Sequence, residues 1–277
     1  MKISVIAPVK NEADYIGYSI MSVLPFVHEI IYAVAPSKDG TEELLTHIKR
    51  HQDAEKLKIF VSKEWNFKVH DMEAYNKAFN FCISKATGDF CWFLHPDMVC
   101  TNPEIIPGIN TKALAFYTHV TSYAGDGLTK IVAGRGKEWK NIHAKQLGLH
   151  YYGGYGSQNE DLYHADITGK EHRHYGIAFE LYPFEVADSH LRVNHYCECK
   201  SYLRRFEKMK NCLKTQNPSF DKGVLEDLAI NHPRVHLKDQ DGHFGSFRFK
   251  EVDEVLPQVF SMHEKEFNEV LGRSHES

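Results

Sequence analysis

A chain of 277 residues with 42% hydrophobic and 25% charged residues is long enough to bury an extensive core. Its formal net charge of -4 argues against a surface that is basic throughout, although a local basic patch would fit. No apolar stretch approaches the roughly 20 residues of a membrane-spanning helix. The start MKISVIAPVKNE becomes polar too early for a secretory signal peptide, so we expect a cytoplasmic protein without a membrane span.

The six cysteines are too few and too irregularly spaced for a disulfide framework, so we expect reduced thiols. Cys82 and Cys91 fall on predicted core elements and should be packing residues. A zinc site from His195, Cys197, Cys199 and Cys212 is disfavoured, because CxC with a distant Cys lacks the CxxC pairs of structural zinc sites. The 18 histidines are dense after residue 142, which can indicate metal chemistry, although most single histidines are surface or capping residues.

The first hundred residues alternate between apolar strands and helical patterns. We predict strands at 3–7, 29–35, 57–61 and 89–94, and helices at 13–24, 41–51 and 72–86. This alternation is typical of a mostly parallel sheet with helices on both faces and right-handed crossovers. Asp39 or Thr41 can cap the second helix, and Gly88 is expected to end the third in a left-handed conformation.

The pattern is less regular after residue 110, with strand-like pieces at 113–123 and 131–133. The segment LGLHYYGGYGSQNEDLYHADITG is rich in glycine and tyrosine, which suits either an acceptor-side loop or a long surface loop without chemistry. VNHYCECKSYLRRFEKMKNCLK predicts a short strand and then a basic amphipathic helix. Two weaker helical patterns follow from Asp221, so we expect one compact unit with an appended C-terminal helical portion.

Polar residues follow three of the predicted strands. The first runs into APVKNEADY, where Asn11 and Glu12 could bind a base or ribose, or Asn11 could cap a helix. The second strand ends in APSKDGT and the fourth in HPD. Ligands bind beyond the carboxyl ends of the strands in open α/β sheets, where these loops meet. Pro96 would end its strand and present His95 and Asp97 to this crevice, or simply form a turn with two exposed polar residues.

Three segments carry a resemblance by their order and spacing: VIAPVKNEADYIGYSIMSVL, EIIYAVAPSKDGTEELL and YNKAFNFCISKATGDFCWFLHPDMV. They resemble family 2 glycosyltransferases of the GT-A fold, in which a strand enters an NE variant, a later strand ends in a DDGSxDGT-like loop, and a GD(F/W) strand ends in DxD. The resemblance covers about the first hundred residues. VNHYCECKSYLRRFEKMK is similar to a later HY...S...K segment of several such transferases.

The resemblance implies an α/β protein with a GT-A (Rossmann-like), mostly parallel sheet flanked by helices. Residues 1–220 would form the GT-A domain, with a donor half at 1–110 and an acceptor half at 111–220. Residues 221–277 would be a C-terminal helical extension. The implied activity is metal-dependent transfer of a sugar from a nucleotide-sugar donor to a hydroxyl of a glycan, lipid or other acceptor, with inversion.

The implied metal ligands lie in two motifs. Asp97 aligns with the final Asp of DxD, whereas His95 replaces the first Asp. His195 of VNHY stands where the family often supplies another metal or phosphate contact. Imidazole suits the later divalent metals, so these ligands favour Mn²⁺ over Mg²⁺. The ion would neutralise charge that develops on the leaving phosphate.

The resemblance also implies donor contacts at Pro8, Asn11, Glu12, Ser37, Asp39, Asn76, Lys77, Lys200 and Arg204. Residues 34–36 are Val, Ala and Pro where the family usually has acids, which leaves the donor base open. Lys200 and Arg204 are four residues apart, so they would lie on the same face of a helix. A basic helix face exposed to solvent would explain them equally well. A nucleic-acid acceptor would bind there, although the overall acidity makes this the less favoured partner.

The resemblance implies that an ED sequence at the start of a helix supplies the base that takes the proton from the acceptor hydroxyl, and SQNEDLYHAD offers two such acids. We favour Asp161 over Glu160. Two acids at a helix start would also be explained by the helix dipole alone.

Two other functions remain open. A non-catalytic GT-A-like protein that binds a nucleotide sugar or a glycan would explain the altered DxD. A nucleotidyltransferase of similar architecture would use the same sheet edge, but VKNEADY lacks the glycine-rich, basic loop that such an enzyme normally has after its first strand.

Overall fold

The computed structural model describes residues 1–51, 55–65, 72–109, 112–124, 130–131, 137–148, 150–151, 162–165, 171–174 and 186–198. The predicted basic helix after VNHY and the predicted C-terminal helices lie outside these residues, and the proposed division at residue 220 stays a prediction. Within the described part of the chain, none of the helices is long and apolar enough to cross a membrane.

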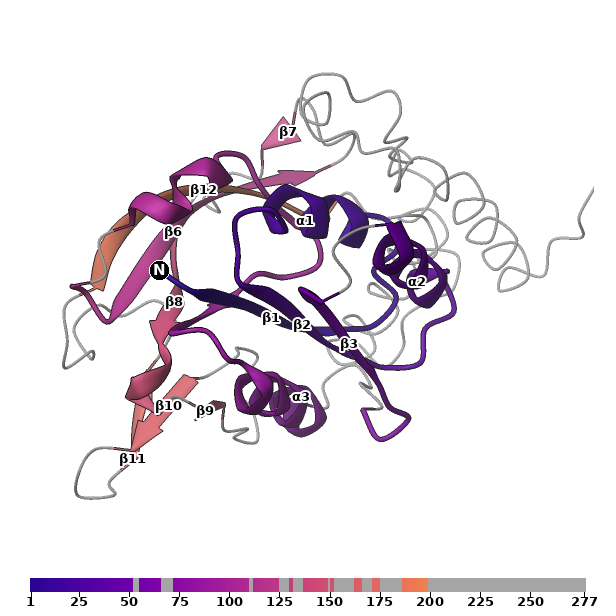
Figure 1. Ribbon diagram of the computed structural model, residues 1–277, viewed down its shortest axis with the longest axis horizontal. Coiled ribbons are helices and arrows are strands. Elements are labelled where there is room, and N and C mark those ends of the chain that lie inside the picture. Colours follow the sequence, from indigo (N-terminus) through magenta and orange to yellow (C-terminus); the bar gives the residue numbers. More distant parts are fainter. Residues whose placement is uncertain are drawn as a thin grey trace, which may run out of the picture.

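The N-terminal half alternates as the sequence predicts. Its elements are β1 (Ile3–Val9), α1 (Ile16–Val23), β2 (Glu29–Val34), α2 (Thr41–His51), β3 (Leu57–Val61), α3 (Met72–Lys85) and β4 (Phe90–Phe93). Figure 1 shows α1 and α2 on one side of the strands and α3 on the other. The predicted sheet with helices on both faces is therefore confirmed.

The main sheet continues with strands that follow β4 in the chain. These are β5 (Met98–Cys100), β6 (Ala115–Ala124), β7 (Lys130–Ile131), β8 (Lys137–Ala144) and β12 (Val186–Glu198). The strand order is β3-β2-β1-β4-β8-β6-β12-β5, with β7 beside β6. The β3-β2-β1-β4 block and the β6–β12 pair are parallel, whereas β8 and β5 are antiparallel to their neighbours.

Smaller elements complete the described structure. Two 3-10 helices are η1 (Pro103–Gly108) and η2 (Lys145–Leu147). A separate three-stranded antiparallel sheet contains β9 (His150–Tyr151), β10 (Leu162–Ala165) and β11 (Glu171–His174).

The core lies on both faces of the sheet because successive side chains of a strand point to opposite sides. Val5, Ile30 and Trp92 belong to one buried cluster, which includes residues of α1 and α2. Ile6 and Phe93 belong to the other, which includes residues of α3. Burial on both faces explains why the first strands are largely apolar along their whole length, and it fixes the carboxyl ends of these strands as one rigid edge.

A buried carboxylate ties three strands together at the opposite, amino end of the sheet. Glu29 is 2% exposed at the start of β2. Its Oε1 accepts hydrogen bonds from Ser4 Oγ (2.6 Å), Thr87 N–H (2.6 Å) and Thr87 Oγ1 (2.9 Å), and its Oε2 accepts one from Lys58 Nζ (2.5 Å). Burial alone would raise the pKa of Glu29, but these hydrogen bonds outweigh it and lower the pKa to about 2.

Gly88 precedes β4 for a reason other than the predicted one. The prediction of a left-handed conformation is wrong, because the described glycines with positive φ are Gly40 and Gly148. The Gly88 N–H donates to Ser4 Oγ (2.9 Å), and an added Cβ would lie 2.7 Å from that oxygen and 2.8 Å from the carbonyl oxygen of Lys2. Glycine is required here by the close approach of two backbones.

Candidate functional site

The loops after β1 and β2 are joined by hydrogen bonds at the carboxyl edge of the sheet. The Asn11 N–H donates to Ser37 Oγ (3.0 Å), and the Lys38 N–H donates to Asn11 Oδ1 (2.8 Å). Asn11 has a φ of 51°, a left-handed conformation that asparagine adopts more readily than most residues. Two of the predicted donor-binding residues thus shape one composite loop.

Asp39 fixes the same composite loop from inside. It is 1% exposed, and its Oδ1 accepts a hydrogen bond from the Thr41 N–H at the start of α2 (3.1 Å). Its Oδ2 accepts from the Ala13 N–H (3.1 Å), and the neighbouring Glu12 N–H donates to Thr41 Oγ1 (2.8 Å). The predicted capping role of Asp39 is confirmed, and the same carboxylate links α2 to the loop before α1.

The remaining predicted donor residues are dispersed. Pro8 is buried within β1. On α3, Asn76 is buried and Lys77 is exposed. Asn76 Oδ1 has no hydrogen-bond partner among the described residues. The other predicted residues, Glu160, Asp161, Lys200 and Arg204, lie outside the described residues.

The HPD segment forms a turn between two strands. β4 ends at Phe93, and the Met98 N–H closes the turn by donating to the His95 carbonyl oxygen (3.0 Å). β5 then pairs antiparallel with β12, so that Met98 stands opposite His195. The Tyr196 N–H donates to the Asp97 carbonyl oxygen (2.9 Å). Two motifs that lie about a hundred residues apart in the chain are therefore neighbours.

The side chains of Asp97 and His195 meet at this junction. Asp97 Oδ1 lies 3.4 Å from His195 Nε2, and the two side chains are 8% and 13% exposed. The other ring nitrogen, His195 Nδ1, lies 3.4 Å from Ser122 Oγ on β6. Tyr196 stacks on Tyr15 with ring centroids 5.0 Å apart. The carboxylate and imidazole are thus held in a largely water-excluded position, and the reading of HPD as a turn with two exposed polar residues is wrong for Asp97.

His95 occupies a different environment. Its ring contacts Phe79 edge to face at a centroid distance of 6.5 Å, and its carbonyl oxygen accepts from Ser19 Oγ (3.4 Å). Among the described residues, the group of histidine and carboxylate ligand atoms close enough to share a metal ion is instead His119, Asp188 and His190. The structure therefore brings Asp97 and His195 together without gathering His95 into the same three-residue group.

The sequence interpretation did not identify this second group. His119 lies on β6, whereas Asp188 and His190 lie on β12, and their proximity arises from the parallel pairing of these strands. The short DSH sequence was the only local signal, since two of the three residues are two positions apart.

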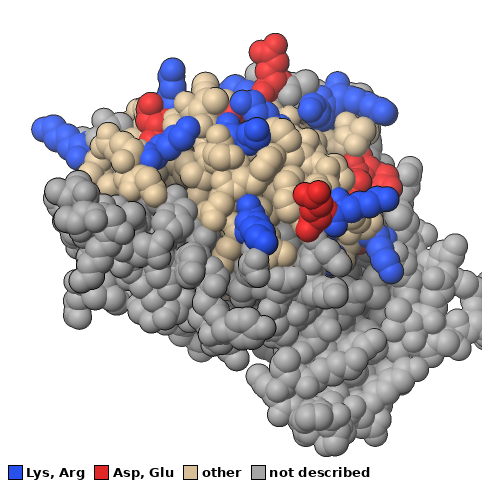
Figure 2. All heavy atoms as spheres, turned by 90° about the horizontal axis from the view of Figure 1, so that it is seen from below, with Lys and Arg blue, Asp and Glu red and all other residues tan. Residues whose placement is uncertain are grey.

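The described part of one face of the molecule carries mixed charge. Figure 2 shows Lys and Arg side chains interspersed with Asp and Glu over the described part of this face. Mixed charge does not form the continuous basic track with which proteins bind nucleic acid.

One protein family matches the part of the chain that carries the polar carboxyl edge. The model of the family described as Glycosyl transferase family 2 matches residues 4–111. This match covers the chain from β1 to the segment after η1, and the sheet with helices on both faces (Figure 1) agrees with the α/β fold that the resemblance implied. None of the curated proteins matches the chain.

Solved structures show more distant similarity. The S. aureus TarS structure in complex with UDP-GlcNAc has 14% identity and a TM-score of 0.44, over 95% of this chain and 79% of that chain. M. tuberculosis glucosyl-3-phosphoglycerate synthase has 19% identity and a TM-score of 0.35, over 53% and 58%. A structure described as a mycobacterial protein has 18% identity and a TM-score of 0.33, over 53% and 54%. The chain spans little more than half the length of the last two, and these similarities assign no substrate.

Proposed function

We propose that this protein is a metal-dependent glycosyltransferase that moves a sugar from a nucleotide-sugar donor to an acceptor hydroxyl. The observation that carries the proposal is the meeting of Asp97 and His195, 3.4 Å apart at the carboxyl edge of the sheet. Ligand sites of open α/β sheets lie at this edge, and the family match to residues 4–111 supports the same class of reaction.

The two side chains fit a divalent ion. One carboxylate oxygen and one imidazole nitrogen, both largely buried, form a donor set that suits Mn²⁺ better than Mg²⁺. Ser122 Oγ, 3.4 Å from the second ring nitrogen, would orient the imidazole as hydrogen-bond partners of metal-binding histidines commonly do. When bound, the ion would act as a Lewis acid on the donor diphosphate.

The composite loop supplies the second part of the proposal. Asn11 and Ser37 join the loops after β1 and β2, and Asp39 anchors both to α2. The donor base and ribose would rest against this preformed surface. Lys77 on α3 is exposed, and its long side chain would contact a phosphate of the donor. Because Asp39 is buried, its contribution would be to hold the loop in shape.

The acceptor side rests on the resemblance alone. Asp161, or its neighbour Glu160, would accept the proton of the attacking hydroxyl, and displacement at the sugar carbon would invert its configuration. Lys200 and Arg204 would contact the diphosphate or an anionic acceptor. The acceptor class, a glycan, a lipid or another hydroxyl compound, follows from no described residue.

The experiment is a thermal-shift screen of the full chain against nucleoside diphosphates and nucleotide sugars, with Mn²⁺, Mg²⁺ or EDTA. A ligand at about 100 times its Kd stabilises the native state by about 2.7 kcal/mol, which corresponds to a rise in Tm of roughly 5–10 °C. The rise should require Mn²⁺ and should be lost in Asp97→Asn and His195→Ala. Asp89→Asn, at an exposed aspartate before β4, is the matched control.

A second readout separates catalysis from binding. Release of nucleoside diphosphate from the identified donor should depend on Asp97 and His195. It should also depend on an acceptor, or be a slower hydrolysis by water when no acceptor is present. A ligand-dependent shift without any turnover in a screen of acceptors would favour the non-catalytic binding protein. A shift that survives in both Asp97→Asn and His195→Ala would contradict the proposed site.

A further inference from the structure

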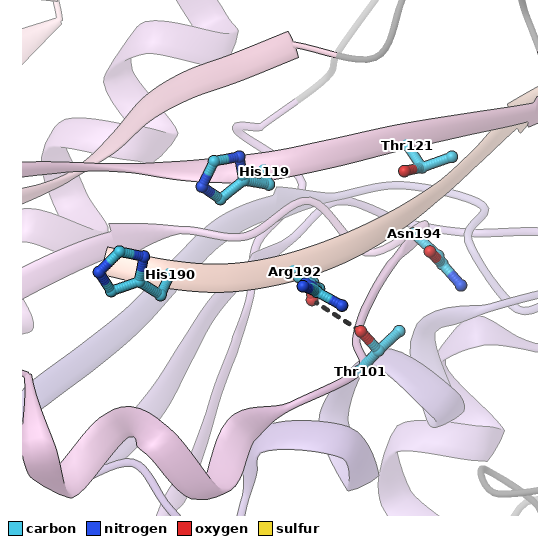
Figure 3. Close-up of a pocket in the computed structure, with 6 residues that line it drawn as sticks. All are labelled: Thr101, His119, Thr121, His190, Arg192 and Asn194. Atoms are coloured by element: carbon cyan, nitrogen blue, oxygen red, sulfur yellow. Dashed lines mark hydrogen bonds between the residues drawn. The ribbon is translucent and has the colours of Figure 1, made fainter. Parts of the chain in front are cut away.

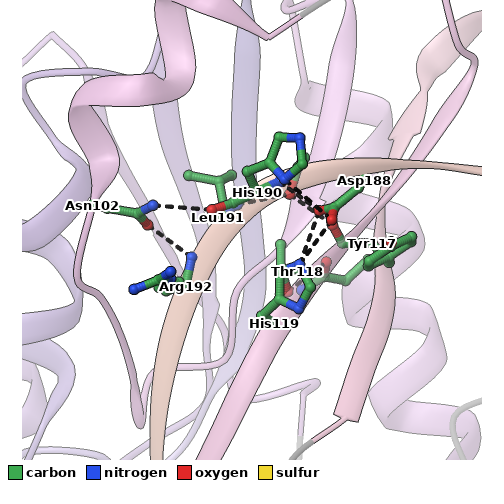
Figure 4. Close-up of polar contacts among 10 residues, drawn as sticks. Asn102, Tyr117, Thr118, His119, Asp188, His190, Leu191 and Arg192 are labelled. Carbon is green, nitrogen blue, oxygen red and sulfur yellow. Dashed lines mark hydrogen bonds and ion pairs between the residues drawn. The ribbon is translucent and has the colours of Figure 1, made fainter.

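A second cluster of metal-ligand side chains lies on the β6–β12 pair. His119 Nε2 is 3.0 Å from both carboxylate oxygens of Asp188, and His190 Nδ1 is 3.1 Å from Asp188 Oδ2 (Figure 4). The ligand atoms of all three residues lie within 4.8 Å of one another. We call these residues the His–Asp–His cluster. It is composed of two imidazoles and one carboxylate, a set that binds divalent transition metals in many proteins.

The cluster is separate from the junction of Asp97 and His195. Thr121 and Asn194 line the same surface cavity as His119. The next residues along the two strands, Ser122 and His195, point to the opposite side of the sheet because strand side chains alternate. His190 precedes His195 by five residues, or roughly 15 Å of strand. A metal ion bound by the cluster could not share ligands with the proposed donor site.

An irregular backbone shapes the cluster. The pairing of β12 with β6 shifts between Asp188 and Arg192, and His190 has a φ of 58°, which is uncommon for a residue other than glycine. Bulges of this kind re-aim side chains and occur often beside functional sites. Here the bulge brings His190 Nδ1 to within 3.1 Å of the Asp188 carboxylate.

Side chains on three sides hold this bulge in place. The Asp188 Oδ1 accepts from the His190 N–H (2.6 Å). Ser189 Oγ donates to the Tyr117 carbonyl oxygen (2.6 Å) and accepts from the Leu191 N–H (3.2 Å). Asn102, just before η1, donates to the His190 carbonyl oxygen (2.9 Å) and accepts from the Arg192 N–H (2.7 Å), as Figure 4 shows. The backbone of His190 is therefore held in place, although its side chain is 79% exposed.

The spacing of the ligand atoms fits a small transition-metal ion. Ligand atoms around a tetrahedral Zn²⁺ at about 2.0–2.1 Å are roughly 3.3 Å apart. The two Asp188 to histidine distances, 3.0 and 3.1 Å, already approach that value. The two imidazole nitrogens lie within 4.8 Å of each other, and rotation of their side chains would complete the arrangement. Mg²⁺ and Ca²⁺ prefer sites made of oxygen atoms, so they suit this cluster less well.

The cluster borders a hollow that leaves room for a further ligand. Figure 3 shows the hollow, a cavity of about 430 Å³ with His119 and His190 in its wall. Its other lining residues are Thr101, Thr121, Arg192 and Asn194. An ion held by three protein ligands keeps a coordination position for water or for an external ligand.

We propose that His119, Asp188 and His190 form a binding site for a divalent transition-metal ion of the Zn²⁺ type, distinct from the donor site. The site would hold the ion by two imidazole nitrogens and one carboxylate, with its open position toward the hollow. It does not depend on the proposed glycosyltransferase activity.

The test uses the full chain freed of metal with EDTA and then titrated with Zn²⁺ in a calorimeter. His190→Asn removes an imidazole while asparagine tolerates the left-handed backbone, and His119→Gln removes the other imidazole at similar size. His28→Gln, an exposed histidine hydrogen-bonded to Thr87, is the matched control. Asp97→Asn is the control for the donor site. Circular dichroism melting curves establish that each variant is folded.

The wild type should bind one equivalent of Zn²⁺ that both cluster variants weaken by at least about tenfold, since even outer partners of metal ligands change affinity by 10–100-fold. His28→Gln and Asp97→Asn should keep this binding. Co²⁺ should give a visible absorption band that is lost in the same two variants. The proposal is overturned if the wild type binds no Zn²⁺, or if folded His190→Asn and His119→Gln bind it as tightly as the wild type. Loss of the binding in Asp97→Asn alone would assign the ion to the donor site instead.

Discussion

The buried carboxylate of Glu29 provides a prediction about stability that is independent of function. Glu29→Gln keeps the size of the side chain and an oxygen that can accept from Ser4 and Thr87. It removes the charge and turns an amide N–H₂ toward the ammonium group of Lys58. The substitution should therefore destabilise the amino end of the sheet without creating a cavity.

The size of the effect follows from the pKa. Folding lowers the pKa of Glu29 from 4.5 to about 2, and each unit corresponds to about 1.36 kcal/mol, so the charged form contributes at most about 3.4 kcal/mol. Lys58 is 37% exposed, so solvent screens part of this attraction. We expect Glu29→Gln to lose about 2 kcal/mol at pH 7, within the range of hydrogen bonds to charged groups.

The pH dependence gives the sharper test. Because the folded pKa is depressed, the stabilisation is fully present above pH 4.5 and is lost as the pH falls toward 2. By pH 3 less than half of it, about 40%, should remain. The free-energy gap between the wild type and Glu29→Gln should therefore narrow between pH 5 and pH 3.

Urea unfolding followed by tryptophan fluorescence measures the gap, because Trp92 is buried in the core. With a slope of roughly 2 kcal/mol/M, the midpoint of Glu29→Gln at pH 7 should fall by about 1 M. Glu64→Gln, at an exposed acid, should stay within about 0.5 kcal/mol of the wild type. An unchanged midpoint for Glu29→Gln, or a gap that is constant from pH 7 to pH 3, would refute the reasoning.

Three further predictions concern packing, thiols and the donor site. Gly88→Ala should destabilise the protein by about 1–3 kcal/mol in thermal unfolding, because the added Cβ meets backbone atoms. Gly108→Ala, whose Cβ meets nothing within 4 Å, should change the stability little. Equal effects of the two substitutions would contradict the close-approach argument. Burial raises the pKa values of the described thiols to about 11 or 12, so they should react with Ellman's reagent only after unfolding; rapid modification of the native chain at these positions would be the opposing result. These thiols are Cys82, Cys91 and Cys100. Ser122→Ala should weaken Mn²⁺-dependent donor binding about tenfold with little change in Tm, and a large loss of Tm without ligand would indicate a packing role instead.

The N-terminal elements could be predicted because local patterns determine them. β1, β2 and β4 are largely apolar and buried throughout since helices cover both faces, and α2 begins with a capping aspartate and two acids. β8 was not predicted, since its buried residues are not all apolar. Asn141 and His143 are buried on one face of the strand and Ile142 on the other, and polar residues on a buried face give no local signal of a core strand. The sheet is consequently more mixed than the sequence indicated.

The candidate site was likewise predictable only in part. The resemblance selected Asp97 and His195 separately, and the pairing of β5 with β12 places them side by side. The buried, loop-linking role of Asp39 and the packing of His95 on Phe79 depend on tertiary contacts that no local motif encodes. The His–Asp–His cluster depends on the register between two strands, so it was invisible to any reading of the chain one segment at a time.

The pairing of β5 with β12 also bears on the order of events during folding. The segment that matches the family ends before β12, so a chain released only to residue 111 would hold Asp97 without its histidine partner. Closing a loop of about a hundred residues carries a large entropic cost, which makes such contacts slow to form. The strand that carries His195 is also the strand that carries two members of the His–Asp–His cluster. Neither of the two proposed metal sites can form until this strand has docked, so metal affinity would report the docking of β12 in the nascent chain.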